Sequence, residues 1–183
     1  MFGKKFSIFA LLWGNFVVGL SILLPTGMLA ELSLGLGVPI GTVGLLISFG
    51  AGVVCVSPPL VAWVTSHISR RALLTAVLVW LAFGHIASAF APNYLTLFII
   101  RLAMLALAGA FTPMAAATAV LLVPEDKRAS VIATVLVGWA LAIAIGLPLI
   151  SLLAPEMGWR ATYSLIGGLW PWPLSPRLFA YFG

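Results

Sequence analysis

Residues 4–29 read KKFSIFALLWGNFVVGLSILLPTGML. Two lysines lead into an apolar run, as in a secretory signal, but the run is too long for a signal and further runs follow it. About 20 apolar residues cross the hydrocarbon core of a bilayer as an α-helix. We therefore predict that this stretch forms the first of several transmembrane helices.

The composition of the whole chain points the same way. Of 183 residues, 63% are apolar and only 7% are charged, whereas soluble domains have about 45–50% apolar and about 25% charged residues. So few charges cannot give a globule a polar surface, which excludes a cytosolic enzyme and a disordered chain. The single cysteine, Cys55, excludes a disulfide framework and a cysteine-based metal site.

The apolar runs predict a helical bundle. Helices and closed barrels alone satisfy every backbone group in lipid, and these runs are much longer than barrel strands. We expect an all-α integral membrane protein with one bundle over residues 1–168. Its expected spans are 7–30, 42–65, 72–91, 94–123, 129–154 and 161–170.

The sixth span is unusual because Pro171, Pro173 and Pro176 follow it. Proline removes a backbone donor and clashes with the preceding carbonyl, so a lipid-exposed helix tolerates this spacing badly. We therefore expect an incomplete sixth helix and an irregular Pro-rich tail over residues 169–183. Truncation or a frame shift near Gly168 would produce such an end.

Basic residues in the connections predict the orientation. Lysine and arginine concentrate in cytoplasmic loops, and singly or doubly placed basics between apolar runs indicate membrane orientation rather than nucleic-acid binding. Arg160 is the one basic residue in the connections that follow the first, third and fifth spans. The N-terminus and the connections that follow the second and fourth spans carry six basic residues, which predicts a cytoplasmic N-terminus: Lys4, Lys5, Arg70, Arg71, Lys127 and Arg128.

Prolines and arginines recur at a nearly constant offset. Pro25 and Pro113 are 88 residues apart, and two further pairs, Pro59 with Pro148 and Arg71 with Arg160, are 89 apart. This offset predicts two three-helix repeats, which run in opposite directions because each has an odd number of spans. Chance alignment of prolines, which are common in membrane helices, is the alternative.

Two polar residues within the predicted spans are candidates for function or packing. An ionisable group such as Arg101 is expensive in lipid unless it faces a cavity or a partner, although it could also reach the headgroups by snorkelling. No acidic residue falls inside an expected span. His85 is expected to be hydrogen-bonded within the bundle.

Small residues gather in the fourth and fifth spans, at Gly109, Gly138 and Gly146, the last of them two residues before Pro148. They allow close helix packing, and Pro148 is expected to bend its helix and free a carbonyl. Close packing alone explains these residues, and a moving bundle would use them too. Neither histidine has metal-ligand spacing, and the sequence shows no phosphate-binding glycine loop or nucleophile–base pair, so we expect no enzyme site, metal or cofactor.

These residues together resemble the major facilitator superfamily, specifically its twelve-span drug:proton antiporters and their arabinose-efflux-permease-like bacterial branch. The likeness covers about residues 7–168. Its most specific part is GLPL at 146–149 followed by GWRATY at 158–163, which resemble the fifth-span antiporter motif and the start of the sixth span. Further matches are PTGML at 25–29, GLL at 44–46 and Arg101 with Gly109.

The resemblance implies several residue roles. Arg101 would take part in proton transfer, Arg70 and Arg71 would belong to a gating loop, and Gly138, Gly146 and Pro148 would form the antiporter-motif bend. The family loop usually reads G-x-x-x-D-R-x-G-R-R, but Ser66 stands at the aspartate position, and Ile22 stands where many members carry a membrane acid. An aspartate latch and that carboxylate are therefore missing.

The implied function is efflux of small organic solutes or drugs by proton antiport in the bacterial inner membrane. The chain resembles the N-terminal six-span half of a twelve-span transporter, so its partners would be the lipid bilayer, substrate, protons and either a C-terminal half or a second copy. A non-transporting fragment and a homodimeric half-size transporter are the alternatives. The candidate cavity-lining residues are Asn15, Ser21, Thr26, Met104, Thr112 and Met114.

Overall fold

The computed structural model describes residues 2–168, which are almost entirely helical and contain no β-strand. The α-helices are α1 (Phe2–Leu23), α2 (Leu29–Leu36), α3 (Ile40–Val64), α4 (Arg70–Ala89), α5 (Tyr94–Ala108), α6 (Phe111–Ala119), α7 (Arg128–Leu141), α8 (Leu147–Met157) and α9 (Trp159–Gly168). Short turns join several of them: the 3₁₀ turns η1 (Leu24–Met28), η2 (Val120–Leu122) and η3 (Glu125–Lys127), and the π-helical turn η4 (Ala142–Gly146).

Five stretches of these helices are long and apolar enough to cross a membrane. They are Lys4–Leu36, Ile40–Val64, Arg70–Ala89, Tyr94–Leu122 and Glu125–Met157, called spans 1 to 5 below. Helix α9 begins the sixth span at Trp159, two residues before its expected start. The expected end of that span at residue 170 and the tail 169–183 lie outside the described residues.

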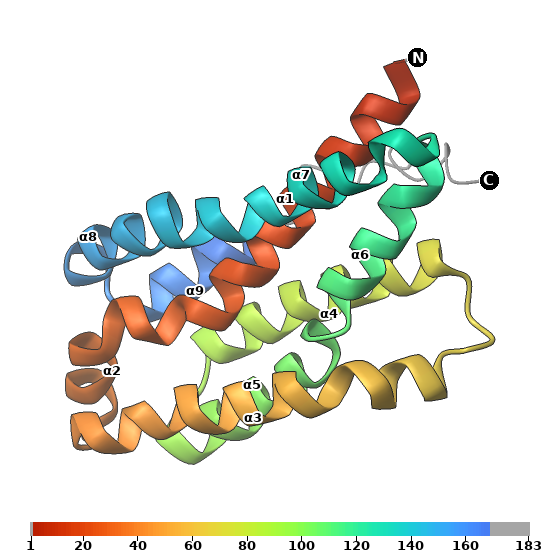
Figure 1. Cartoon of the computed structure of the whole chain (residues 1–183). Helices are drawn as coiled ribbons and strands as arrows, with labels where there is room; N and C mark the ends of the chain where they lie inside the picture. The colour runs from red at the N-terminus through yellow and green to blue at the C-terminus, as the bar shows by residue number, and fades with distance from the viewer. Residues whose placement is uncertain (1, 169–183) are drawn as a thin grey trace.

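The connections alternate between the two ends of the bundle (Figure 1). The N-terminus, the α3–α4 loop and the α6–α7 connection gather at one end, and the α2–α3, α4–α5 and α8–α9 connections gather at the other. The six basic residues counted above therefore share one end of the bundle.

The main helix contacts relate the two three-helix repeats. Span 1 packs along span 5 through α1 and α7, and its counterpart, span 4, packs along span 2 through α5 and α3. The third helices of the two repeats, α4 and α9, pack on each other. Exchanging the repeats leaves these three contacts unchanged, so the predicted bundle of two inverted repeats is confirmed.

The repeat-related prolines have different effects on their helices. Pro25 lies in the 3₁₀ turn η1, and Pro113 follows the interruption between α5 and α6 at Gly109–Ala110. Pro148 follows the π-helical turn η4, whereas α3 continues without interruption through Pro58 and Pro59. The first helix of each repeat is therefore discontinuous.

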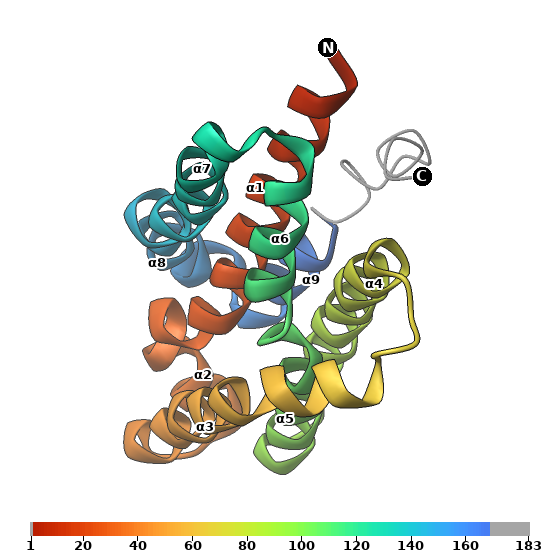
Figure 2. The same ribbon diagram turned by 45° about the vertical axis from the view of Figure 1, so that its right-hand side comes forward.

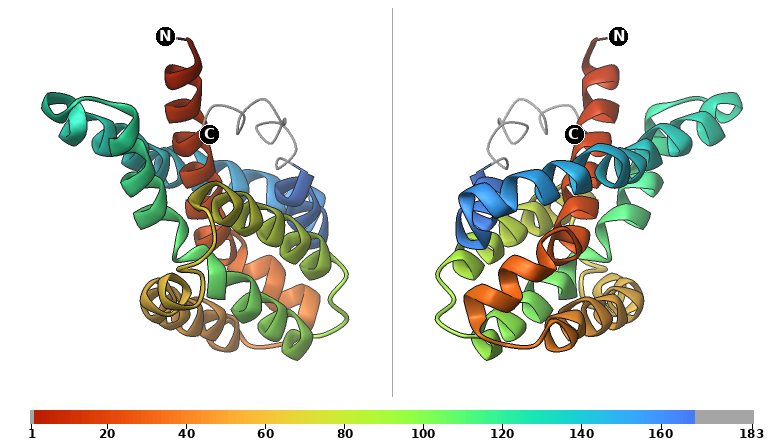
Figure 3. Two further views of the ribbon diagram at one scale, coloured as in Figure 1. Left: turned by 90° about the vertical axis from the view of Figure 1, so that its right-hand side faces the viewer. Right: turned by 90° about the vertical axis from the view of Figure 1, so that its left-hand side faces the viewer.

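Span 1 lies in the interior of the bundle, with α7 and α8 on one side and α4 on the other (Figure 2). Within an apolar stretch of 18 residues in span 1, 56% of the residues are buried, whereas the corresponding shares are 22% in span 2 and 28% in span 5. Spans 2 and 5 are counterparts in the two repeats, and both lie at the outside of the bundle (Figure 3). Many of their apolar side chains are exposed, among them Phe49, Trp63 and Leu152. Lipid or another protein surface must cover these side chains.

The buried core has two apolar clusters with polar side chains between them. One cluster, on the side of the N-terminus, includes Val18, Leu81 and Leu105, and the other includes Leu24 and Leu97. Three fully or almost fully buried polar side chains occupy the level between the clusters, namely those of Ser21, His85 and Arg101. We call these three residues the polar layer.

Candidate functional site

The discontinuity in span 1 is the structural basis of the candidate site. An α-helical residue normally donates its N–H to the carbonyl four residues earlier, but Pro25 has no N–H, so the carbonyl of Ser21 loses its helical partner. In the 3₁₀ turn that follows, donors reach back three residues instead of four. The carbonyl of Ile22 therefore also becomes available.

Arg101 donates hydrogen bonds to both of these carbonyls. Its Nη1 lies 3.2 Å from the oxygen of Ser21, and its Nη2 lies 2.6 Å from the oxygen of Ile22. The Arg101 side chain is 1% exposed, so it lies inside the bundle and does not extend along the surface. Within the described residues, no carboxylate pairs with this guanidinium.

His85 of span 3 contacts the same turn of span 1. The Ser21 hydroxyl donates to the carbonyl of Val17 at 2.8 Å, so it accepts a hydrogen bond from His85 Nε2 at 2.7 Å. The expected hydrogen bond of His85 within the bundle is therefore confirmed. Ser21 joins three spans, because its hydroxyl contacts span 3 and its carbonyl contacts span 4.

Tyr163 of α9 completes the surroundings of the polar layer. Its hydroxyl lies close to the Arg101 guanidinium without hydrogen-bond geometry, and its ring centroid is 5.9 Å from that of His85. Among the described residues, the Tyr163 hydroxyl, His85 Nδ1 and Arg101 Nε have no hydrogen-bond partner. The polar layer and Tyr163 therefore bring together side chains from spans 1, 3 and 4 and from α9.

A second polar cluster joins spans 1, 4 and 5. The Thr112 hydroxyl donates to Asn15 Oδ1 at 2.6 Å and accepts from Trp139 Nε1 at 3.2 Å. Asn15 Nδ2 donates to the carbonyl of Val135 at 2.9 Å. Two of the predicted cavity residues, Asn15 and Thr112, are thus in direct contact, next to the discontinuity of span 4 at Gly109–Ala110.

The other predicted cavity residues do not join these two. Met104 is buried against span 3, where it fills the space that a side chain at Gly84 would need. Thr26 is exposed in the 3₁₀ turn, and the half-buried Met114 lines a groove between α3 and α6. Ser21 belongs to the polar layer. The six residues therefore occupy several separate environments in this bundle.

The two arginines of the predicted gating loop lie at the start of α4. Ser69 caps this helix, since its hydroxyl accepts from the backbone N–H of Ala72 at 3.4 Å. Arg70 is exposed and lines the groove that contains Met114 and Pro113, while Arg71 is half-buried. Arg70 thus lies beside the discontinuity of span 4.

Two of the predicted antiporter-motif residues, Gly138 and Gly146, lie where spans 1 and 5 meet, whereas Pro148 is exposed. A Cβ at Gly138 would overlap the carbonyl oxygen of Leu12 and lie 2.8 Å from the backbone N of Phe16. A Cβ at Gly146 would lie 2.6 Å from Leu20 Cδ1. The absence of side chains therefore allows close packing, and the π-helical turn Ala142–Gly146 distorts span 5 just before Pro148.

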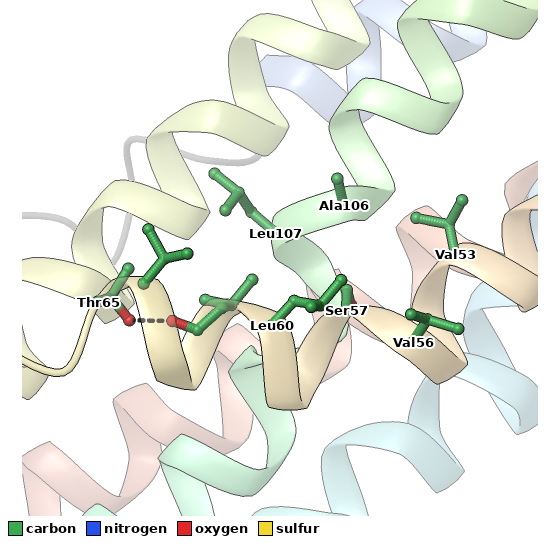
Figure 4. A pocket seen from close by; sticks show the side chains of 9 residues that line it. Val53, Val56, Ser57, Leu60, Thr65, Ala106 and Leu107 are labelled. Atoms are coloured by element: carbon green, nitrogen blue, oxygen red, sulfur yellow. Dashed lines mark hydrogen bonds between the residues drawn. The ribbon is translucent and has the colours of Figure 1, made fainter.

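An apolar groove of about 430 Å³ runs between α3 and α5 (Figure 4). Its two hydroxyl groups, on Ser57 and Thr65, donate to carbonyls of their own helix. Apolar side chains form the rest of its lining. Such a surface can accommodate apolar chains or another helix, but it offers no group for catalysis.

Sequence reasoning missed Trp139 and Tyr163 as members of the two polar clusters. Both are aromatic, so they counted toward the apolar composition, although each has a polar atom that seeks a partner when buried. In residues 2–168, no three side chains of His, Cys, Asp or Glu are arranged to hold a metal ion.

Comparison with known proteins matches residues 11–170 to the sequence family described as Major Facilitator Superfamily. The inner membrane transport protein YdhP of Escherichia coli (strain K12) is 34% identical over 165 residues, which are 90% of this chain and 42% of YdhP. A probable sugar efflux transporter of Mannheimia succiniciproducens is 28% identical, covering 90% of this chain and 41% of that protein. The chain therefore spans about two fifths of the length of these relatives.

A solved structure supports the same fold. The crystal structure of the peptide transporter POT in complex with sulfate superposes with a TM-score of 0.77 and 19% sequence identity. The match covers 98% of this chain and 37% of that chain. At this identity, the likeness concerns the arrangement of helices alone.

Proposed function

The chain belongs to the major facilitator superfamily, and from this premise we propose that it forms one wall of an efflux transporter in the bacterial inner membrane. Its substrates would be small organic solutes or drugs, exported in exchange for protons. Alternating access would come from rocking of two helical bundles about a site near the middle of the membrane. The drug:proton antiporter branch is the part of the family that this proposal favours.

The observation that carries the proposal is the pair of discontinuous helices. Transporters of inverted repeats build their sites where membrane helices are interrupted, since freed backbone groups and polar side chains can then face a cavity. Here the first helix of each repeat is interrupted, at Pro25 and before Pro113. The polar layer adjoins the first interruption, and the Asn15–Thr112 contact adjoins the second.

Efflux, rather than uptake, is proposed from two features. The fifth-span sequence GLPL at 146–149 resembles the antiporter motif, and it begins at the last residue of the π-helical turn in span 5. Two of the relatives are described as probable sugar efflux transporters. Their described activity supports export by this chain as well, without fixing a substrate.

Proton coupling is proposed to involve Arg101. It is the buried ionisable side chain that the family resemblance associates with proton transfer. Burying a guanidinium at this depth costs free energy, so a function for it is the default expectation. Ile22 occupies the position expected for a membrane acid. Arg101 would therefore act without that carboxylate, and the gating loop with Arg70 and Arg71 would act without its aspartate.

The second wall is proposed to come from a C-terminal half or from a second copy of the chain. The aligned region corresponds to about two fifths of the relatives, so the remainder of their transport pathway has no counterpart in it. Spans 2 and 5 offer the broad exposed faces that such a partner would cover. A fragment that does not transport is the alternative.

Everted membrane vesicles test the proposal. The chain is expressed alone or together with the C-terminal half of E. coli YdhP, and a pH-sensitive dye reports proton release after addition of ethidium, chloramphenicol or arabinose. We expect a substrate-dependent signal when both halves are present and little or none with the chain alone. A signal from the chain alone favours a homodimer, and no signal with both halves present at normal abundance contradicts proton-coupled efflux of these classes.

A further inference from the structure

The discontinuity in span 1 leaves backbone carbonyls that need hydrogen-bond donors from outside their own helix. The α-helical part of the span ends at Leu23, and because Pro25 has no N–H and the chain continues as a 3₁₀ turn, the carbonyls of Ser21 and Ile22 have no helical donors. These groups lie at the level between the two apolar clusters, away from both ends of the bundle. Unpaired carbonyls are costly at this depth because no water replaces the missing donors.

The last turn of α1 is also a site of negative potential. Aligned peptide dipoles place a partial negative charge at the C-terminal end of a helix. The Arg101 guanidinium lies at this end, donating one N–H to the carbonyl of Ser21 and another to that of Ile22. The helix end therefore supplies the acceptors and the negative potential that a carboxylate would otherwise supply.

We infer that Arg101 is a positioning residue that caps the interrupted end of α1. Its two hydrogen bonds satisfy the carbonyls that Pro25 and the 3₁₀ turn release, and they fix the place where span 1 changes direction. Span 4 thereby controls the geometry of span 1. This role depends on Pro25 and is independent of whether the chain transports.

The second interruption is stabilised differently, which makes the cap specific to span 1. At the α5–α6 discontinuity, Gly109 packs so closely on α3 that a Cβ would lie 2.7 Å from the carbonyl oxygen of Val54. Close backbone packing therefore holds that site. The repeat offset of 88 residues places Trp13, rather than a basic residue, at the position equivalent to Arg101.

His85 reinforces the cap from span 3. It hydrogen-bonds the Ser21 hydroxyl, while Arg101 hydrogen-bonds the Ser21 carbonyl. The same residue of α1 is therefore fixed through its side chain and through its backbone. Any change in the bend of span 1 must break contacts with two other spans.

A double-mutant cycle on the purified full chain in detergent tests this inference. Arg101→Gln is combined with Pro25→Ala, which restores an N–H for the Ser21 carbonyl. We expect Arg101→Gln to lower the melting temperature by about 2–4 °C when Pro25 is present, and by less than half as much in the Pro25→Ala background. Pro148→Ala is the matched control, because Pro148 is exposed on span 5 while Arg101 is buried and donates to span 1, and it should leave the effect of Arg101→Gln unchanged.

Amide hydrogen exchange supplies a readout that general loss of stability would not produce. Arg101→Gln should accelerate exchange about tenfold or more in residues 20–28 and leave residues 105–112 unchanged, because the cap acts at one interruption only. Arg101→Lys should give an intermediate rate in residues 20–28, since one ammonium cannot satisfy both carbonyls equally well.

Two results would overturn the inference: equal falls in melting temperature with Pro25 present and in the Pro25→Ala background, or equal acceleration of exchange at both interruptions. If Arg101→Gln yields no folded protein, the same cycle is measured with Arg101→Lys. If amide exchange in residues 20–28 of Arg101→Lys stays at the wild-type rate, this result would also contradict the capping role of Arg101.

Discussion

Arg101 Nη2 lies 2.6 Å from the backbone carbonyl oxygen of Ile22, the residue that stands where the family resemblance places a membrane acid. At the position where a carboxylate was expected, the Arg101 side chain therefore contacts the backbone carbonyl of Ile22. A carbonyl cannot take up the proton that a carboxylate would carry.

Replacement of Arg101 should separate insertion from transport. Arg101→Leu is expected to insert normally, because leucine favours the hydrocarbon, while gradient-driven efflux falls to background when the chain is combined with a second half. Arg101→Lys should restore only part of the activity, since the ammonium lacks the planar fork that contacts two carbonyls. Vesicle transport assays, normalised to protein abundance, measure both variants. Normal transport by Arg101→Leu would remove Arg101 from the coupling mechanism.

The orientation of the bundle can be measured with single cysteines. In a Cys55→Ala background, a cysteine replacing the exposed Ser66 should react with a membrane-impermeant thiol reagent only after permeabilisation. One replacing the exposed Glu156, at the opposite end of the bundle, should react in intact cells. The basis is the concentration of lysine and arginine at the N-terminal end. The reverse labelling pattern would place the N-terminus outside the cytoplasm.

Much of the fold was accessible from the sequence because the bilayer imposes simple requirements. Apolar length and backbone satisfaction led to the helical spans, and the proline offset led to the inverted repeats. Proline spacing could not show what each proline does, since α3 continues through Pro59 while span 1 is interrupted at Pro25. Local packing decides that outcome.

The candidate site was accessible only in part. Arg101 and His85 stood out because each is strongly polar within an apolar run. Their shared contact with Ser21 depends on how spans 1, 3 and 4 are placed, which one-dimensional spacing does not contain. Met104 was predicted to line the cavity, but the rotation of its helix turns its side chain toward Gly84 of span 3.

The Thr112 hydroxyl should contribute to stability by joining Asn15 and Trp139. Thr112→Val keeps the shape of the side chain but leaves Asn15 Oδ1 and Trp139 Nε1 without this partner. We expect a loss of about 1–2 kcal/mol in the free energy of unfolding, at the upper end for hydrogen bonds between membrane helices. Thermal unfolding in detergent measures the loss.

Thr134→Val is the control for this substitution. The Thr134 hydroxyl donates to the Ser130 carbonyl of its own helix at 2.9 Å and joins no other span. Its removal should change the free energy of unfolding by less than half as much. Equal losses in the two variants would show that Thr112 does not act through the contact between spans.

Gly138 should be the least replaceable small residue in the contact between spans 1 and 5. Gly138→Ala would bring a methyl group into the backbone of span 1, at the Leu12 carbonyl and 2.8 Å from the Phe16 nitrogen, where no flexible side chain can move aside. Separation of the helices should cost about 1–3 kcal/mol or more, as in other overpacked interiors.

Gly44→Ala on α3 is the matched control, since a Cβ there meets no atom within 4 Å and alanine favours the helix. Thermal unfolding and size-exclusion profiles in detergent should show a destabilised, aggregating Gly138→Ala variant beside a Gly44→Ala variant at least as stable as the wild type. Equal stability of the two variants would mean that spans 1 and 5 can separate at Gly138 without a cost in free energy. Gly138 would then not be required for the close approach of these spans.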